Sequence, residues 1–593
     1  MKKIIFTINI FLSFLLSGCN DGFMDRFPET EITEEVFFSS PEDLETYTNS
    51  FYGYLGASYR DIGTDNLIYL EECTLYSMLR NEITEKNIGG WGSAWGQIRN
   101  VNYLLNNVHR ATGNTVDINH YHGIARLFRA YLYYDLVKTY SDVPWYSRPL
   151  ETTDEELLYK PQDSRELVVD SIMADLAFAV KNIKADETKT MFNKWSALAM
   201  QARIALHEGT FRKYHDELNL SNGDDFIKIA KQASWEIIEH GGFAISSESV
   251  EGCGAYQSLF GNPNLLQNPE MILILDYDKV LRTHESKRVF NFNSGLSKSL
   301  VDDYLYIKDG KTIPSHQVEG YNETGYLDIA KNRDPRLAQT LMEPGYIQPG
   351  LDTEVRAKLE IGGYPQKKFY PLIYDGLDYP KTYMDLPFFR YAEILLIYAE
   401  ARAELGELTQ DDLNKTVNLL RDRVNMPHMY LDDILKDIDP VQMNRYNNVS
   451  GPQKGAILEI RRERRIELAC EGFRHDDLFR WKVAHLVAEN TEGAYIDKLG
   501  LRDVTGDGEP DYAVVATQAD ADNIPQDIKD KYKLTTYVLE KDVFFLTEGD
   551  HGYIGLLSQK DRFKFENPKY YYYPIYEQDM IVNPNLKQNI YWK

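Results

Sequence analysis

Four long stretches of the chain repeat apolar residues with the period of an α-helix, and this pattern constrains the fold more than any other feature. They cover residues 126–140, 193–208, 390–405 and 456–486. In the first, the side chains that share one face are Leu127, Ala130, Tyr131, Tyr134 and Val137. Each stretch is long enough to form a helix that buries one face against a neighbour.

Capping and helix-breaking residues set the expected ends of these helices. Asn193 is a good N-terminal cap, and Gly209 is a typical stop, so we expect a helix over 193–208. Gly472 is expected to divide the fourth stretch into two helices. Weaker helical patterns cover 43–59, 93–110, 164–182, 224–240 and 411–424. The sequence therefore predicts a mainly α-helical body.

Two regions lack this periodicity. Residues 246–386 and the tail 491–593 are rich in Gly, Pro, Asn, Asp and Tyr, with only short apolar runs such as Met271–Leu275. Such composition is typical of loops and short strands. Long irregular segments in a compact protein commonly carry function. We expect residues 246–386 to form an irregular, ligand-binding lobe between helical regions 19–245 and 387–593.

The N-terminus indicates an exported lipoprotein. Met1-Lys2-Lys3 precedes an apolar run that ends at Leu16-Ser17-Gly18-Cys19. A charged start, a short apolar core and a small-residue cleavage site form a secretory signal, here residues 1–18, and the apolar run is too short to span a membrane. The position of the cysteine is typical of a bacterial lipobox, so we expect Cys19 to be acylated and to anchor the mature protein in a membrane.

Charge and cysteine content exclude several classes of protein. The net charge is −26, and loss of Lys2 and Lys3 with the signal makes it more negative. A surface of this sign repels phosphate backbones, so nucleic acid is not an expected partner. Cys73, Cys253 and Cys470 have neither zinc-type nor redox-type spacing. We expect them to be packed as small apolar side chains, with no cofactor required.

One acidic loop has the spacing of a calcium site. Oxygen-bearing side chains alternate in Asp503, Thr505, Asp507, Glu509 and Asp511, around Gly506 and Gly508. Calcium prefers such oxygen ligands, but the glutamate that would complete an EF-hand loop is replaced by Val514. We expect a structural Ca²⁺ in a short aspartate-glycine loop, with a plain solvated turn as the alternative.

The 42 tyrosines and 7 tryptophans supply flat surfaces on which sugar rings stack. Trp91 lies between glycines and is expected to project from the backbone, with Trp95 one helical turn further on. The irregular lobe contributes Tyr256, Tyr321 and Tyr326. We expect these five residues to bind ligand, although packing is the alternative for each tyrosine.

Motifs in sequence order along the chain resemble the SusD/RagB family. The N-terminal ones are Phe23-Met24-Asp25-Arg26-Phe27-Pro28, Trp95 to Asn102, and Arg129-Ala130-Tyr131 followed by Asp142-Val143-Pro144. The later ones are Arg333 to Leu337, Arg390 to Ile394, Asn418 to Arg423, Glu463 to Arg474 with Arg480-Trp481, and Tyr573-Pro574-Ile575 with Asn583 to Asn589. His475-Asp476 and Ile590-Tyr591-Trp592 depart from the family pattern.

The resemblance implies a solenoid-like body of paired tetratricopeptide-like helices, a loop-rich inserted lobe, and no catalysis. It also implies a lipoprotein of the outer membrane, facing the exterior, which captures oligosaccharide and delivers it to a SusC/RagA-like TonB-dependent transporter. A peptide receptor of the RagB type is one alternative. A helical glycoside hydrolase or lyase is another, since paired carboxylates are not recognisable from sequence.

The segment Glu463 to Arg474 is the most charged motif. Arg464 with Glu467, and Glu471 with Arg474, are spaced three apart, which places each pair on one helix face. Arginine held by carboxylates anchors helices more often than it attacks a substrate. We therefore expect these residues to have a structural role.

Overall fold

The computed structural model describes residues 37–69, 72–290, 294–352, 354–560 and 563–593. The predicted signal peptide and Cys19 lie outside this part of the chain. No helix within it is long and apolar enough to cross a membrane.

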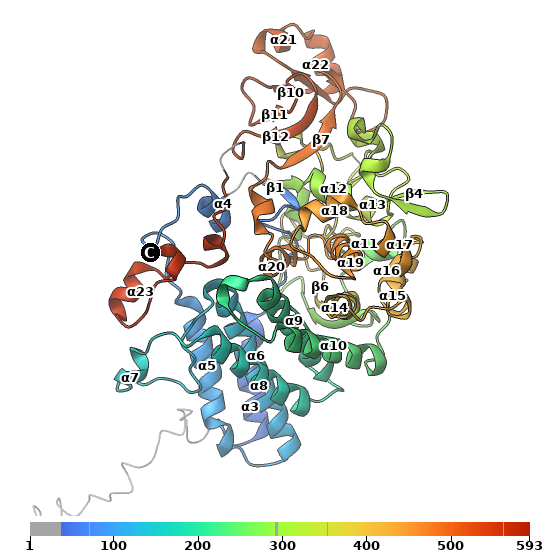
Figure 1. Ribbon diagram of the computed structural model, residues 1–593. Coiled ribbons are helices and arrows are strands. Elements are labelled where there is room, and N and C mark those ends of the chain that lie inside the picture. Colours follow the sequence, from blue (N-terminus) through green and yellow to red (C-terminus); the bar gives the residue numbers. More distant parts are fainter. Residues whose placement is uncertain (1–36, 70–71, 291–293, 353, 561–562) are drawn as a thin grey trace, which may run out of the picture.

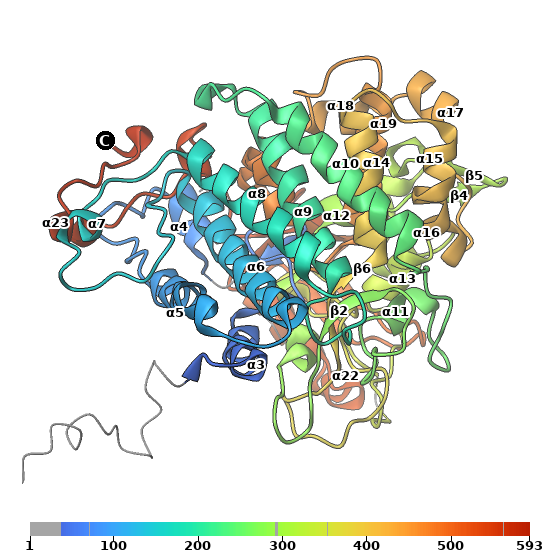
Figure 2. The same ribbon diagram turned by 90° about the horizontal axis from the view of Figure 1, so that it is seen from below.

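Long helices stacked one on the next form the body of the molecule (Figures 1 and 2). They are α3 (Pro41–Asn49), α5 (Ser93–Asn107), α6 (Thr115–Tyr140), α8 (Arg165–Asn182), α9 (Lys194–Tyr214), α10 (Gly223–His240), α14 (Tyr391–Glu404) and α19 (Lys454–Glu467). From α5 onward each helix packs against the next in this order. This confirms the predicted mainly α-helical body of tetratricopeptide-like pairs.

Helix α9 shows how local sequence determines where a helix of the body begins and how closely the next helix packs against it. Asn193 caps its start, as predicted, and forms a reciprocal capping box with Ser196. The predicted stop at Gly209 is wrong, because α9 continues to Tyr214. A Cβ at Gly209 would lie 2.6 Å from Cγ1 of Ile227. Gly209 therefore serves the close approach of α10 rather than the end of a helix.

Shorter helices connect and flank the body. They are α4 (Thr74–Leu79), α7 (Glu155–Leu158), α11 (Ala255–Ser258), α12 (Lys298–Asp303), α13 (Arg336–Thr340), α15 (Gln410–Lys415), α16 (Val417–Arg423), α17 (Leu431–Lys436), α18 (Pro440–Arg445), α20 (Arg474–Arg480), α21 (Gln518–Asp522), α22 (Gln526–Tyr532) and α23 (Glu577–Val582). The break at Gly472, which has φ +83°, is confirmed between α19 and α20. The predicted helix over 411–424 is interrupted at Thr416.

The strands are short and form small sheets. They are β1 (Leu67–Tyr69), β2 (Met271–Leu275), β3 (Ser294–Leu296), β4 (Tyr306–Lys308), β5 (Lys311–Ile313), β6 (Leu386–Arg390), β7 (Glu492–Ile496), β8 (Gly500–Arg502), β9 (Tyr512–Val515), β10 (Thr535–Val538), β11 (Phe544–Leu546) and β12 (Gly552–Leu556). Antiparallel pairs are β1 with β3, β2 with β6, and β4 with β5.

Two three-stranded sheets, ordered β10-β9-β8 and β11-β12-β7, are built from the C-terminal tail. With α21 and α22 they project from one end of the molecule, at the top of Figure 1. The pairing of β2 with β6 ties the start of the 246–386 region to the strand that leads into α14. This region consists of loops, short strands and short helices, as predicted, while its role as a separate lobe stays a prediction.

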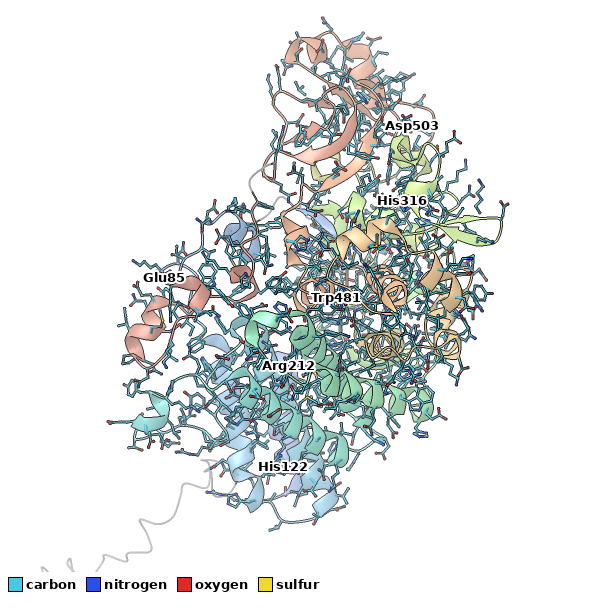
Figure 3. The ribbon with its side chains drawn as sticks, viewed as in Figure 1. Glu85, His122, Arg212, His316, Trp481 and Asp503 are labelled. Atoms are coloured by element: carbon cyan, nitrogen blue, oxygen red, sulfur yellow. The ribbon has the colours of Figure 1, made fainter. Side chains whose placement is uncertain are left out.

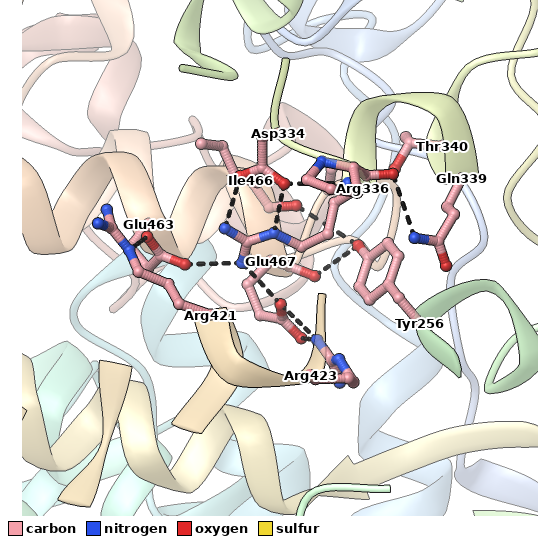
Figure 4. Close-up of polar contacts among 12 residues, drawn as sticks. Tyr256, Asp334, Arg336, Gln339, Thr340, Arg421, Arg423, Glu463, Ile466 and Glu467 are labelled. Carbon is pink, nitrogen blue, oxygen red and sulfur yellow. Dashed lines mark hydrogen bonds and ion pairs between the residues drawn. The ribbon is translucent and has the colours of Figure 1, made fainter. Parts of the chain in front are cut away.

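A buried ionic cluster joins distant segments of the chain (Figure 4). Glu467, at the end of α19, is wholly buried and accepts hydrogen bonds from Arg336 at 3.0 Å and from Arg390 and Arg423 at 2.7 Å. Burial alone would raise the pKa of Glu467, but the three guanidinium groups hold it well below its usual range. Glu270 contacts the same Arg390, at 3.0 Å.

The predicted pairs within the charged helix are wrong. Arg464 contacts Asp477 of α20 at 2.8 Å, and Arg474 contacts Asp65 at 2.7 Å. The helix lies in the core, so most of its charged side chains reach neighbouring elements, although Arg462 and Glu459 pair within it at 3.0 Å. Every charged side chain from Glu463 to Arg474 is paired, and all but the half-buried Glu471 are buried, which agrees with the structural role expected for the motif.

Candidate functional site

A cavity of about 340 Å³ lies beside α5 and is partly covered by the C-terminal tail. We call it the tryptophan cavity. It is lined by Trp91, Trp95, Ile98, Arg99, Asn102, Pro144, Tyr146, Arg148, Pro149, Leu150, Leu158, Asp579, Val582, Asn583 and Leu586. Its size falls within the range of ~300–1,000 Å³ that is typical of small-molecule sites.

Aromatic rings form one wall of the tryptophan cavity. The centroids of Trp91 and Trp95 are 5.6 Å apart, and their planes cross at 80°. Tyr146 meets Trp95 edge-on at 5.7 Å, and Tyr140 meets Trp91 edge-on at 5.4 Å. These edge contacts fix the orientation of both indoles. Trp95, which is half-buried, is therefore held as a rigid surface at the cavity.

Polar side chains lie in the same cavity wall. Asn102 donates to the Tyr146 carbonyl at 2.8 Å, and its Oδ1 accepts a hydrogen bond from Arg129 of α6 at 3.0 Å. Arg129 in turn binds Asp175 of α8 at 2.7 Å. This chain of contacts ties α5, α6 and α8 together behind the cavity.

The C-terminal tail supplies the opposite wall. Asp579 of α23 accepts a hydrogen bond from the Trp91 amide at 3.2 Å. The amide of Glu577 donates to the carbonyl of Glu85 at 2.8 Å, and Figure 3 shows Glu85 beside α23. Asn583 donates to the Lys160 carbonyl at 2.9 Å. Sequence reasoning missed Asp579 as a wall residue, because its contact with Trp91 spans almost the whole chain.

Trp91 and Trp95 are brought together, as the sequence predicts, but Trp91 does not project from the surface. Its side chain is 9% exposed, because Trp95 and Tyr140 cover it. The glycines beside it allow this inward turn as readily as an outward one. The predicted exposure of Trp91 is wrong, and its contact with ligand stays a prediction, as does that of Trp95.

The tyrosines of the irregular lobe are not placed at this cavity. Tyr256 is 0% exposed, its hydroxyl donates to the Glu467 carbonyl at 2.8 Å, and Lys368 donates to it at 2.7 Å. Its predicted role in binding is wrong, because the ring belongs to the core. Tyr321 and Tyr326 are each 7% exposed, and neither lines the tryptophan cavity. The five aromatic residues expected to bind ligand therefore do not line one cavity.

The hydroxyls of these two tyrosines are also engaged. Tyr321 donates to Asp302, and Tyr326 donates to the Met342 carbonyl. Their rings pack against Tyr306 and Tyr364, respectively. Little of either ring is left exposed to a ligand, and their predicted contact with ligand stays a prediction.

The acidic loop, near the C-terminal projection at the Asp503 label of Figure 3, turns on itself. Asp503 accepts hydrogen bonds from the amides of Thr505, Gly506 and Gly508, at 3.0, 2.6 and 2.8 Å. Asp507 accepts from the amide of Glu509 at 2.8 Å.

Asp511 closes the same loop. Its carboxylate accepts from the amide and the hydroxyl of Thr505 at 3.0 Å and contacts Arg356 at 2.9 Å. Within the described residues, no group of three or more His, Cys, Asp or Glu side chains is arranged to hold a metal ion. The loop geometry thus fits a hydrogen-bonded turn, and calcium binding stays a prediction.

The stacked helix pairs define a mainly α-helical, solenoid-like fold, and comparison with known families identifies it. The model of the SusD family matches residues 286–592, more than half of the chain. A second family model, described as starch-binding associating with outer membrane, matches residues 23–206. The chain belongs to the SusD family, which confirms the resemblance seen in the sequence.

Known relatives cover most of the chain at low identity. A SusD-like protein of Formosa agariphila is 23% identical over 527 residues, which span 84% of this chain and 95% of the relative. The structure of a SusD-like carbohydrate-binding protein from Bacteroides fragilis superposes with a TM-score of 0.67 at 22% identity and covers 93% of this chain and 100% of that one.

A structure solved with a xylogluco-oligosaccharide has a TM-score of 0.55 at 15% identity and covers 91% of this chain and 97% of its own. At such identities the structural likeness establishes the fold.

Proposed function

We propose that this protein binds a glycan in the tryptophan cavity. One observation carries the proposal: two indoles and Tyr146 are locked edge-on beside polar side chains in a cavity of about 340 Å³. The C–H faces of a sugar ring stack on aromatic rings, while its hydroxyls bind groups such as those of Arg99 and Asp579. The carbohydrate-binding description of the Bacteroides fragilis relative supports the same ligand class.

The cellular role follows from the family and the N-terminus. We propose that Cys19 is lipidated, that the protein lies at the outer membrane facing the exterior, and that it delivers glycan to a SusC/RagA-like TonB-dependent transporter. The description of the matching family model as associating with outer membrane supports the location.

The carboxylates of the cavity support binding rather than hydrolysis. Glycosidases place two carboxyl groups on either side of the scissile bond, ~5–10 Å apart. Among the described residues that line the tryptophan cavity, Asp579 is the one carboxylate. It already accepts a hydrogen bond from the Trp91 amide. We therefore propose a binding protein, not an enzyme.

A glycan and peptide array, probed with the protein lacking residues 1–19, tests the proposal. We expect oligosaccharide hits with micromolar or weaker affinity, about −8 kcal/mol or less favourable, because a sugar exchanges hydrogen bonds with water for similar ones with protein. Trp95→Ala should abolish the glycan hits. Peptide hits without glycan hits would replace the proposal with the RagB-type alternative, and release of new reducing ends from a bound polysaccharide would overturn the non-enzymatic assignment.

A further inference from the structure

A second cavity, of about 220 Å³, lies beside α6. We call it the arginine cavity. It lies among α6, α9, β6 and α20, where Tyr134, Lys138, Arg203, His207, Arg464 and Asp476 are among the lining residues. Its volume is more than ten times the ~10–15 Å³ that one water molecule needs. The cavity therefore has room for a small organic ligand.

Arg203 of α9 presents unused hydrogen-bond donors to this cavity. Its Nε and Nη2 bind Glu393 at 2.6 and 2.7 Å, and Nη2 also donates to the Phe388 carbonyl at 3.0 Å. Its Nη1 makes no hydrogen bond within the described part of the chain, and the side chain is 19% exposed. The guanidinium lies 4.1 Å from the centroid of Phe389, which holds it in place.

Arg464 of α19 also has a hydrogen-bond donor without a partner. Its Nε donates to both carboxylate oxygens of Asp477, at 2.8 and 3.0 Å, and Asp477 is shared with Arg480 at 2.9 Å. Nη1 of Arg464 is shielded from solvent and has no hydrogen-bond partner among the described residues. A buried, unpaired donor on a charged group is costly, but this atom has almost no surface open to the cavity, so Arg464 contributes positive charge near a ligand rather than a hydrogen bond to it.

The acids in the wall are better satisfied than the bases. Asp476 is paired with Lys138 at 3.0 Å, Glu393 and Asp477 are paired with the two arginines, and Glu471 is paired with Arg390 at 2.7 Å. The fifth wall carboxylate, Asp135, is exposed and lies 3.4 Å from Lys138. Burial lowers the pKa of His207 to about 3, so its ring is neutral, and its Nδ1 has no partner among the described residues. The unfilled hydrogen-bonding capacity of the cavity therefore consists mainly of cationic donors.

We propose that the arginine cavity binds a small organic carboxylate. A carboxylate offers two oxygens in one plane, which matches the edge of a guanidinium, and hydrogen bonds to charged donors are the stronger kind. The rings of Tyr134 and Phe388 in the wall would pack against the carbon part of the ligand. A neutral ligand would leave the same donors without a charged acceptor. This site is separate from the tryptophan cavity and does not rest on the function proposed for it.

Isothermal titration calorimetry with acetate, glucuronate and glucose tests the proposal on the protein lacking residues 1–19. We expect acetate or glucuronate to bind and glucose to bind at least tenfold more weakly. Arg203→Lys removes the planar fork but keeps the charge, and should weaken carboxylate binding at least tenfold. Arg212→Lys is the matched control, since Arg212 is also an α9 arginine paired with a glutamate but does not line the cavity. It should leave binding unchanged.

The ligands distinguish two sources of the same chemical group. Binding of glucuronate indicates a carboxylate carried on a sugar, and binding of acetate alone indicates a free small acid; both support the proposal. Lys138→Met, at a more exposed position, replaces Arg203→Lys if that variant does not fold. Trp95→Ala should leave carboxylate binding intact, whatever it does to glycan binding. Absence of carboxylate binding in the unmutated chain, or equal weakening by Arg203→Lys and Arg212→Lys, would overturn the proposal.

Discussion

Separate replacement of the two cavity tryptophans should show that one contributes mainly to folding stability and the other mainly to affinity for the ligand. Trp91 is 9% exposed, whereas Trp95 is half-buried and lines the same cavity. Burial of an aromatic side chain removes ~150–250 Å² from water. At about 25 cal/mol per Å² this corresponds to roughly 4–6 kcal/mol, an upper bound because the unfolded chain also buries surface. The neighbouring cavity lets the structure relax, so we expect Trp91→Ala to lower the free energy of unfolding by about 3 kcal/mol.

Trp95→Ala should mainly lower the affinity for the ligand. Its ring is less buried, so we expect a loss of unfolding free energy of about 1–2 kcal/mol, and a loss of oligosaccharide affinity of at least tenfold, or about 1.4 kcal/mol. A folded Trp91→Ala variant should also bind the oligosaccharide more weakly, because the ring of Trp91 orients Trp95.

Urea unfolding measures the stability of each variant, and calorimetry with an array-identified glycan measures its affinity. Tyr374→Ala is the control, since Tyr374 is 69% exposed and lies outside the cavity lining. It should change the free energy of unfolding by no more than about 0.5 kcal/mol. Unchanged stability of Trp91→Ala would refute the burial argument, and unchanged affinity of a folded Trp95→Ala would remove the tryptophan cavity as the glycan site.

Three further predictions follow from other parts of the chain. Glu467→Gln should lower the free energy of unfolding at pH 7 by about 3–5 kcal/mol, because three arginines lose the negative charge that they share. The pKa of Glu467 lies below its ordinary 4.5, so this loss of stability should shrink below pH 4.5. Urea unfolding measures the loss, and Glu166→Gln, at an exposed position, should show none. Calcium should raise the melting temperature slightly and Asp507→Ala should abolish the rise, whereas equal melting temperatures in calcium and chelator would favour a plain turn. Cys19→Ala should move the folded protein out of the membrane fraction, and continued detergent-dependent partition would contradict lipidation.

The helices were predictable because their signals are local. The capping box at Asn193 and the break at Gly472 depend on residues a few positions away. Gly209 misled the prediction because a glycine that ends a helix and one that admits a neighbouring helix look alike in sequence. The close approach of Gly223 and Ile227 of α10 distinguishes the two roles.

The cavity and the ionic cluster were only partly predictable, because both are made by contacts between distant segments. The spacing of Trp91 and Trp95 indicated that the two would meet, but their wall partner Asp579 lies in the C-terminal tail. The spacing of Arg464 and Glu467 suited a pair on one helix face. In the core, arginines from three other segments reach Glu467 instead.

The buried ion pairs have a consequence for making chimaeras of this family. The two family models match separate N-terminal and C-terminal regions of the chain, which suggests chimaeras that combine the two regions from different relatives. Asp65, from the first region, holds Arg465 and Arg474 of the second, at 3.0 and 2.7 Å. A half transplanted without its matched acid or base would bring an uncompensated charge into the core, at a cost of several kcal/mol. Recombination that keeps these partners together should yield folded hybrids, whereas recombination that separates them should yield insoluble ones.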